Sequence, residues 1–366
     1  MAVFERIDGD GHEQVVYCHD RPSGLRAIVA IHSTRLGPAL GGTRFHRYAH
    51  EDDALADVLR LARQMTYKSA AAGLDLGGGK AVIMGDPATD RSEGLLRAYA
   101  GFVDTLGGRY ITAEDVGTTQ ADMDLIRQET AHVTGVSPAL GGSGDPSAAT
   151  AYGVLQAMKA VSLRLWGETS LTGRHVVVSG LGKVGSSLAR HLIEERVRLT
   201  VSDVRGEAAD TAVDRLGAEK APADEAHGVE CDLFSPCAMG GVLDATTIGE
   251  LNCRAVVGSA NNQLADPAGA DLLAAAGILY APDFIVNAGG VINIAEELRG
   301  YDSIRAHAQV ARIFDTTTAV LEAAQRDGVT TVRAAEQRAE QRLAAVAAGS
   351  TVRRFPSGPA VVQGRA

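Results

Sequence analysis

Cysteine and recognisable metal-ligand spacings are scarce in this 366-residue sequence. The four cysteines, Cys18, Cys231, Cys237 and Cys253, form no CxxC pair of the kind that binds zinc. The ten histidines form no HExxH motif or comparable ligand spacing. The sequence therefore predicts reduced thiols and no metal site.

Long apolar runs and a basic surplus are also missing. No run approaches the roughly 18 apolar residues that span a bilayer, and the first residues lack the basic-then-apolar order of a signal peptide. Lys and Arg total 35 against 45 Asp and Glu, a formal net charge of -10, which argues against the basic surface that nucleic-acid binding requires. We expect a cytoplasmic protein with small-molecule partners, and neither nucleic acid nor membrane among them.

What is present is an ordinary globular composition, 45% hydrophobic and 22% charged, at a length that suggests two domains. Residues 1–140 are predicted to form an α/β unit with strands at 14–18 and 25–32, a Gly/Pro-rich loop, a long helix, and a strand after Lys80. Small, turn-forming residues at 141–147 suggest a hinge. A second domain is predicted over 141–324. The helical region beyond Ala306, chiefly about 325–360, is expected to pack back on the first domain and complete it.

Two lysines in the first domain stand out. Helical steps of three and four residues connect Val58, Leu61, Met65, Lys68 and Ala72. Lys68 should therefore project from an apolar helix face, while Lys80 follows three consecutive glycines. A lysine held out of water or beside another cation has a lowered pKa and can act as a base or nucleophile. The alternative is that Lys68 reaches solvent and Lys80 lies in a mobile loop.

The second domain carries a dinucleotide-binding pattern. A β-branched strand at 174–179 precedes a GxGxxG segment, a helix at 186–195, a strand at 197–202 and then Asp203. The pyrophosphate-binding segment is Gly180, Leu181, Gly182, Lys183, Val184 and Gly185. Asp203 can accept from both adenine-ribose hydroxyls and would repel a 2′-phosphate, which favours NAD over NADP, although Arg205 weakens that preference. The alternative is a Rossmann-like fold whose loop binds nothing.

Three further short strands, at 232–234, 255–258 and 278–280, each precede a loop of small or polar residues. The alternation predicts an α/β protein: an N-terminal substrate and oligomerisation domain followed by a Rossmann-type, doubly wound NAD-binding domain. Loops at the carboxyl ends of such strands line the ligand crevice.

Several motifs together resemble the glutamate/leucine/phenylalanine/valine dehydrogenase family. They are GPALGGTR at 37–44, MTYK at 65–68, GGGK at 77–80, TAEDVGT at 112–118, PCA at 236–238, ANN at 260–262 and NAGG at 287–290. The resemblance extends from about residue 14 to 342 and is greatest to the valine and leucine enzymes.

The resemblance implies NAD-dependent, reversible oxidative deamination of an L-amino acid to a 2-oxo acid and ammonia. Lys68 would bind the substrate α-carboxylate, Lys80 would activate water for attack on the imine, and Asp115 would hold the substrate amine and shuttle protons. Further contacts around the substrate would come from Gly41, Gly42, Met65 and Asn262. Groups near the nicotinamide and its ribose would be Thr150, Cys237, Ala238, Ala260, Asn262 and Asn287.

Side-chain specificity is implied by four apolar residues that match the family's pocket positions: Leu40, Ala113, Val291 and Ile294. Glutamate-specific relatives carry a lysine where Leu40 stands, so a substrate γ-carboxylate would have no partner here. Valine, leucine or isoleucine is therefore the expected substrate.

Two alternative functions and the number of subunits stay open. Hydride transfer needs no thiol, so we do not expect Cys237 to be a nucleophile, and we expect Glu114 to orient the loop rather than to react. A phenylalanine or broad-range dehydrogenase is the second enzyme hypothesis, and a catalytically silent nucleotide-binding regulatory protein is the hypothesis from another class. A homo-oligomer, dimer or higher, is expected.

Overall fold

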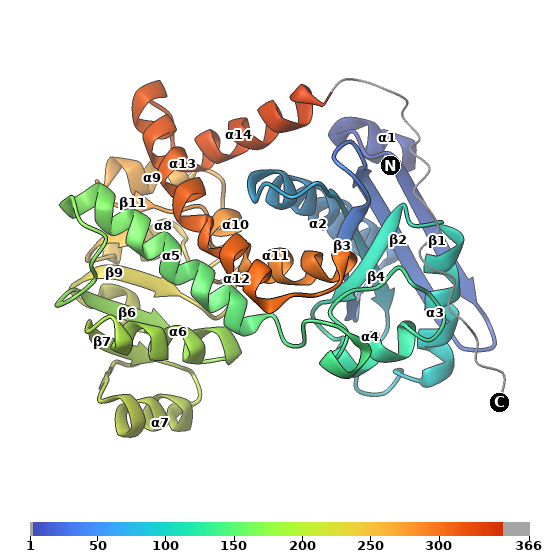
Figure 1. The fold of residues 1–366 in the computed structure, drawn as a ribbon, viewed down its shortest axis with the longest axis horizontal. Helices are drawn as coiled ribbons and strands as arrows, with labels where there is room; N and C mark the ends of the chain where they lie inside the picture. The colour runs from blue at the N-terminus through green and yellow to red at the C-terminus, as the bar shows by residue number, and fades with distance from the viewer. Residues whose placement is uncertain (1–2, 347–366) are drawn as a thin grey trace. The chain divides into compact units, whose positions relative to one another are not determined.

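The computed structural model describes residues 3–346, which divide into two compact units (Figure 1). Within the described residues, unit 1 consists of 3–145, 294–302 and 339–346, and unit 2 consists of 146–293 and 303–338. Among the helices of residues 3–346, none is both long and apolar enough to cross a membrane.

Unit 1 is built on a five-stranded sheet in the order β1-β2-β4-β3-β5. The strands are β1 Gln14–Asp20, β2 Leu25–Ser33, β3 Ala39–His46, β4 Gly77–Met84 and β5 Tyr110–Glu114. β2 pairs antiparallel with β1 and β4, whereas β3 lies parallel between β4 and β5. The carboxyl ends of β4, β3 and β5 therefore run to the same edge of the sheet.

Helices cover both faces of this sheet. α2 (Glu51–Ala71) packs Leu55, Val58 and Ala62 against β2 and β4, and α1 (Val3–Asp10) adds to the same cluster. α3 (Glu93–Thr105) and α4 (Gln120–Ile126) contribute to the core on the other face. α2 begins with three acidic residues, which favour the positive end of the helix dipole, and its apolar residues recur at helical spacing.

Glycines allow α2 and the neighbouring strands to approach closely. Their positions differ from two of the sequence predictions. A Cβ on Gly78 would lie 2.0 Å from the Thr66 backbone nitrogen of α2, and one on Gly41 would lie 1.8 Å from the Gly79 carbonyl oxygen. The segment expected to be a Gly/Pro-rich loop therefore contains β3, because its glycines serve close packing rather than a turn. Lys80 likewise lies within β4, not before it.

Unit 2 contains a six-stranded parallel sheet in the order β11-β10-β9-β6-β7-β8. The strands are β6 His175–Ser179, β7 Arg198–Ser202, β8 Glu219–Lys220, β9 Cys231–Pro236, β10 Cys253–Val256 and β11 Leu279–Tyr280. The chain runs outward from β6 to β8, then returns to β9 on the other side of β6. This reversal makes a doubly wound sheet with its switch point between β6 and β9, as predicted.

The helices of unit 2 follow the expected alternation with the strands. They are α5 Ser147–Trp166, α6 Lys183–Glu194, α7 Gly206–Leu216, α8 Ala245–Glu250, α9 Gly269–Ala275, α10 Asp283–Val286, α12 Ser303–Ala311 and α13 Ile313–Asp327. α11 (Gly289–Ala295) and α14 (Thr331–Ala345) each contain a point where the division between units falls.

The C-terminal helices depart from the prediction. α12 and α13 pack beside α5 in unit 2, as Figure 1 shows, because their buried residues complete the core there. Only residues from 339 onward belong to unit 1, where Arg342 donates to the Ala70 carbonyl at 3.1 Å. Residues 294–302 also belong to unit 1, and Glu297 accepts from the backbone N–H of Gly135 and Ser143. The part of 325–360 beyond residue 346 lies outside the described residues.

Candidate active site

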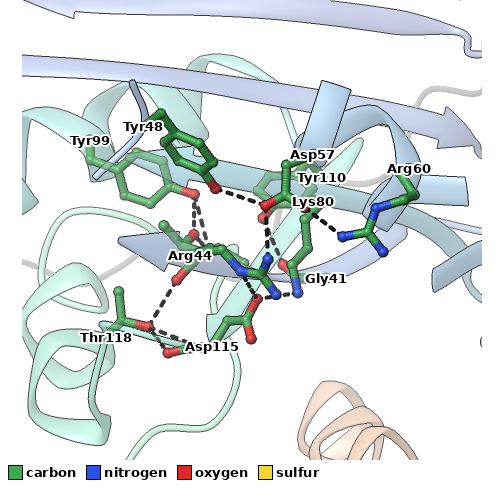
Figure 2. A network of polar contacts seen from close by, with 12 residues as sticks. Gly41, Arg44, Tyr48, Asp57, Arg60, Lys80, Tyr99, Tyr110, Asp115 and Thr118 are labelled. Carbon is green, nitrogen blue, oxygen red and sulfur yellow. Dashed lines mark hydrogen bonds and ion pairs between the residues drawn. The ribbon is translucent and has the colours of Figure 1, made fainter. Parts of the chain in front are cut away.

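A buried ion pair lies at the centre of the unit 1 site. Lys80 is 7% exposed and belongs to the face of the sheet that α2 covers. Its ammonium pairs with Oδ2 of Asp115, in the turn directly after β5 (Figure 2). The Asp115 N–H donates to Thr118 Oγ1 at 2.9 Å, and Thr118 Oγ1 donates to the Thr43 carbonyl at 2.9 Å, so the turn is fixed on β3.

A second cation faces the same carboxylate. Nε of Arg44, on β3, lies 3.6 Å from Asp115 Oδ2. Burial by itself raises the pKa of Asp115, but the Lys80 ammonium and the Arg44 guanidinium outweigh it and hold that pKa below its ordinary value. Asp115 is therefore an ionised carboxylate between two positive groups.

Arg44 is anchored from its other side by Asp57 of α2. Nη1 of Arg44 lies 2.8 Å from Asp57 Oδ2, which also accepts from the Tyr48 hydroxyl at 2.8 Å. Arg60 donates to Asp57 Oδ1 at 2.6 Å. Figure 2 shows the Arg44 guanidinium between the two carboxylates.

Gly41 and Gly42 keep the sheet surface beside this ion pair free of side chains. A Cβ on Gly42 would lie 2.9 Å from the Asp115 Cβ, and one on Gly41 would lie 3.4 Å from Cγ of Met65. The buried Tyr110 hydroxyl donates to the Gly41 carbonyl at 2.6 Å and fixes the strand from below. The predicted residues Gly41, Gly42, Met65, Lys80 and Asp115 are thus brought together.

The other predicted substrate residues divide between the units. Lys68 is half-buried on α2, one helical step from Met65. Leu40 and Ala113 are buried on β3 and β5, and Ile294 also belongs to unit 1. Asn262, which has a left-handed backbone at φ 53°, and Val291 belong to unit 2.

The glycine segment of unit 2 joins β6 to the first turn of α6. Gly180 adopts φ 104°, and a Cβ there would meet that of Ala238 at 2.6 Å. A Cβ on Gly185 would lie 1.9 Å from the Gly180 carbonyl oxygen, which keeps the helix against the strand. Nothing lies within 4 Å of the Cβ position of Gly182, where α6 begins. An anion can therefore approach the backbone N–H groups at this helix start.

Asp203 follows β7 and contacts this segment directly. Its Oδ2 accepts from the Leu181 N–H at 2.7 Å, and its Oδ1 accepts from the Arg205 N–H at 2.8 Å. Burial raises the pKa of Asp203, but these hydrogen bonds and the Arg205 charge hold it below its ordinary value. Arg205 Nε also donates to Oδ1, at 3.3 Å, whereas Oδ2 keeps a second lone pair with which Asp203 can accept from a ribose hydroxyl.

Loops from neighbouring strands adjoin the glycine segment. The Cys237 N–H donates to Ser179 at 2.7 Å and the Ala260 N–H to Pro236 at 3.0 Å, which links the ends of β6, β9 and β10. Thr150 lies at the start of α5, where its Oγ1 would be 2.8 Å from a Cβ on Gly290. Cys237 Sγ lies 3.4 Å from Ser235 Oγ.

Asn287 supplies an available acceptor in the same region. Its side-chain nitrogen donates to the Ser259 carbonyl at 3.1 Å and to Asn261 Oδ1 at 2.8 Å. Its Oδ1 is buried with no hydrogen-bond partner in the structure. Such an orphaned oxygen suits an amide or hydroxyl donor from a bound cofactor. Within residues 3–346, no group of three or more His, Cys, Asp or Glu side chains is placed to hold a metal ion.

Comparison with known proteins decides the family. The Glu/Leu/Phe/Val dehydrogenase dimerisation domain matches residues 12–132, and the Glutamate/Leucine/Phenylalanine/Valine dehydrogenase domain matches 141–213 and 208–350. The chain belongs to the Glu/Leu/Phe/Val dehydrogenase family. It is thus an oxidoreductase of the amino-acid dehydrogenase type, with NAD as its cofactor. The open glycine segment, Asp203 and the orphaned Asn287 oxygen all fit that dinucleotide.

Individual known proteins are similar to this chain over nearly its whole length. The leucine dehydrogenase of Geobacillus stearothermophilus is 51% identical over 94% of both chains. The valine dehydrogenase of Streptomyces virginiae is 52% identical over 92% of this chain and 95% of its own. The crystal structure of L-tryptophan dehydrogenase from Nostoc punctiforme matches with a TM-score of 0.84 and 43% identity, over 94% of this chain and 99% of that one.

The sequence did not predict the residues that position Asp115, which are Arg44 and the two residues behind it, Asp57 and Tyr48. Arg44 lies inside a motif that carried the family resemblance, but nothing in its spacing indicated a contact across the parallel strands to Asp115. Asp57 and Tyr48 gave no signal, because their meeting depends on how α2 packs on the sheet.

Proposed function

We propose that this protein catalyses the reversible NAD-dependent oxidative deamination of a branched-chain L-amino acid to its 2-oxo acid and ammonia. The observation that carries the proposal is the buried Lys80–Asp115 ion pair beside the closely packed glycines Gly41 and Gly42. The similarity to leucine and valine dehydrogenases at about half identity supports the same reaction.

Each charged side chain has a distinct task in this proposal. Lys68 binds the α-carboxylate of the substrate as a fixed cation, with Gly41, Gly42 and Met65 around it. Asp115 accepts a hydrogen bond from the substrate amine and passes protons. Lys80 takes a proton from water as that water attacks the imine carbon, so a C–O bond forms before ammonia leaves.

The cofactor residues hold and orient the dinucleotide. When bound, NAD would supply the acceptor for the hydride of the substrate α-carbon. Gly180, Gly182 and Gly185 leave room for its pyrophosphate at the start of α6, and Asp203 accepts from the adenine ribose. The remaining cofactor contacts are assigned to Leu181, Lys183, Val184, Thr150, Cys237, Ala238, Ala260, Asn262 and Asn287.

The substrate side chain is assigned to four apolar residues, Leu40, Ala113 and Ile294 of unit 1 and Val291 of unit 2. We expect reductive amination of 3-methyl-2-oxobutanoate, with NADH and ammonium, to have a higher kcat/KM than that of 2-oxoglutarate. The reason is that a second carboxylate would be desolvated against Leu40 without a partner. NADH absorbance over a substrate panel measures this ranking, and the reverse ranking would overturn this assignment.

A phenylalanine-type or broad-range activity is the second candidate, favoured by the similarity to L-tryptophan dehydrogenase. One methylene changes the free energy by which an enzyme discriminates between substrates by only about 1 to 3 kcal/mol. The aromatic and aliphatic hypotheses therefore predict different rankings of kcat/KM, not activity on one class alone. Side-by-side kcat/KM values for valine, leucine, phenylalanine and tryptophan separate them. If none of these amino acids reduces NAD at alkaline pH, the silent nucleotide-binding alternative replaces both.

Cofactor choice gives a separate prediction. In Asp203→Asn the amide oxygen can still accept from the Leu181 N–H, but the charge that repels a 2′-phosphate is lost. We expect the preference for NAD over NADP, measured as the ratio of kcat/KM, to fall at least about 10-fold. The control is Asp210→Asn, which removes an exposed acid of α7 that pairs with Lys220 of β8. It should leave the ratio unchanged. Equal ratios in wild type and Asp203→Asn would contradict the assignment.

We also propose a homo-oligomer in the cytoplasm. The family domain that matches residues 12–132 is described as a dimerisation domain, and the related glutamate dehydrogenase of Thermus thermophilus is hetero-hexameric. Light scattering at several protein concentrations tests assembly, and a monomer at every concentration would exclude it.

A further inference from the structure

The Asp115 carboxylate offers one oxygen, Oδ2, to two cations. Lys80 contacts it from β4, and Arg44 approaches it from β3 at 3.6 Å. All three side chains are mostly buried. Water therefore screens their charges weakly, and each cation has a substantial effect on the carboxylate.

The two cations differ in how permanently they are charged. A base that removes a proton from water changes its own charge during the reaction, so a lysine in that role is sometimes neutral and sometimes positive. An arginine stays protonated throughout. If Lys80 were the sole counter-charge, Asp115 would become an uncompensated buried anion whenever Lys80 was neutral. It would then take a proton and could no longer hold a substrate ammonium.

We propose that Arg44 is a positioning residue whose permanent charge holds Asp115 in place and returns it to the ionised form after each proton that it passes. This inference rests on the proposed roles of Lys80 and Asp115. Arg44 contacts Asp115 rather than the substrate, so it acts through the carboxylate.

Asp57 holds Arg44 in the position that this task requires. Arg44 bridges the two carboxylates, with Nη1 2.8 Å from Asp57 and Nε toward Asp115. Burial lowers the pKa of Arg44, but Asp115 and Asp57 outweigh it, so the guanidinium is firmly charged. The Tyr48 hydroxyl and Arg60 satisfy the remaining capacity of Asp57. Asp57 thus accepts from Arg44, Tyr48 and Arg60, whereas the ion pair of Lys80 is with Asp115.

The charged groups around Asp115 come from four places. They are Lys80 on β4, Arg44 on β3 with Tyr48 just after it, Glu114 as the chain neighbour, and Asp57 and Arg60 on α2. Removing Arg44 deletes a cation that lowers the pKa of Asp115, so that pKa must rise. Removing Arg60 deletes the same charge from the same network, but Arg60 pairs with Asp57 alone.

The test is an infrared titration of full-length protein with NADH bound. Asp115 is identified as the protonated-carboxyl band that each variant loses on adding Asp115→Asn. In Arg44→Met the protonation midpoint should rise by at least about 1 pH unit relative to wild type. Arg44→Gln, which keeps an N–H donor for Asp57 but no charge, should show the same rise. Arg44→Lys, which keeps the charge, should stay near wild type, and Arg60→Met should not move.

Turnover gives the second readout. We expect kcat/KM for the amino acid to fall at least about 10-fold in Arg44→Met and Arg44→Gln and to recover in Arg44→Lys, with the KM for NAD unchanged. An unmoved midpoint in Arg44→Gln, or an equal rise in Arg60→Met, would overturn the inference. Since the band needs no turnover, that failure is distinguishable from a wild-type protein that deaminates no amino acid, which would overturn the proposed function instead.

Discussion

Lys80→Ala is expected to lower kcat for oxidative deamination at least about 10²-fold while NAD binding stays intact. The variant removes the amine that we propose to activate water, whereas the glycine segment proposed to receive the dinucleotide lies in unit 2. Asp115 keeps Arg44 as a counter-charge, so the fold should survive the loss of its partner. The rate of NADH formation, followed by absorbance, gives kcat. A titration followed by NADH fluorescence gives the dissociation constant for the dinucleotide.

The matched control for that variant is Lys159→Ala. Lys159 is also partly buried and ion-paired, with Glu195 at 2.5 Å, but it lies on α5 in unit 2. Its removal should leave kcat within about twofold, because an isolated partly exposed ion pair contributes little. Near-normal turnover in Lys80→Ala, or an equal loss in Lys159→Ala, would remove Lys80 from the chemistry.

Gly78→Ala should have the largest effect on stability. The added methyl would lie 2.0 Å from the Thr66 backbone nitrogen and 2.3 Å from its hydroxyl oxygen, so α2 must move away from β4. Overpacking against backbone is expected to cost at least about 3 kcal/mol of unfolding free energy. Urea unfolding at fixed protein concentration measures it, and activity should fall in parallel because Lys80 is two residues away.

Gly101→Ala provides the comparison for Gly78→Ala. Gly101 lies on an exposed face of α3 with nothing within 4 Å of its Cβ position. Alanine there should leave stability unchanged or raise it by up to about 1 kcal/mol, because glycine is a poor helix former. Equal unfolding midpoints for Gly78→Ala and wild type would show that the α2–β4 contact yields without cost.

Local sequence pattern predicted the parts of the fold whose contacts form between segments that are consecutive in the sequence. The β6–glycine–α6–β7 sequence is such a case, because strand, turn and helix are consecutive and Asp203 returns to Leu181. β3 was misjudged as a loop for the opposite reason. Its glycines make sense only beside Gly79 and Glu114, which come from other parts of the chain.

The same distinction applies to the site. Motifs identified Lys80, Asp115 and the glycines as members of one family pattern. The sequence did not reveal that Arg44 and Lys80 share one Asp115 oxygen, because the contact depends on the parallel order β4-β3-β5. The C-terminal helices were misassigned because α13 has a buried face that would suit either unit, and tertiary packing against α5 decided it.

Helix α2 contains three residues whose positions matter for different reasons. Asp57 near its beginning anchors Arg44, Thr66 presses on Gly78, and Lys68 lies in its final turns. Any translation or rotation of α2 therefore moves all three residues together. Efforts to reshape substrate preference should therefore leave the buried side of α2 untouched. A substitution there would disturb the anchor of Arg44, the packing on β4 and the position of Lys68, the proposed carboxylate ligand, and would resemble a defect in the chemistry.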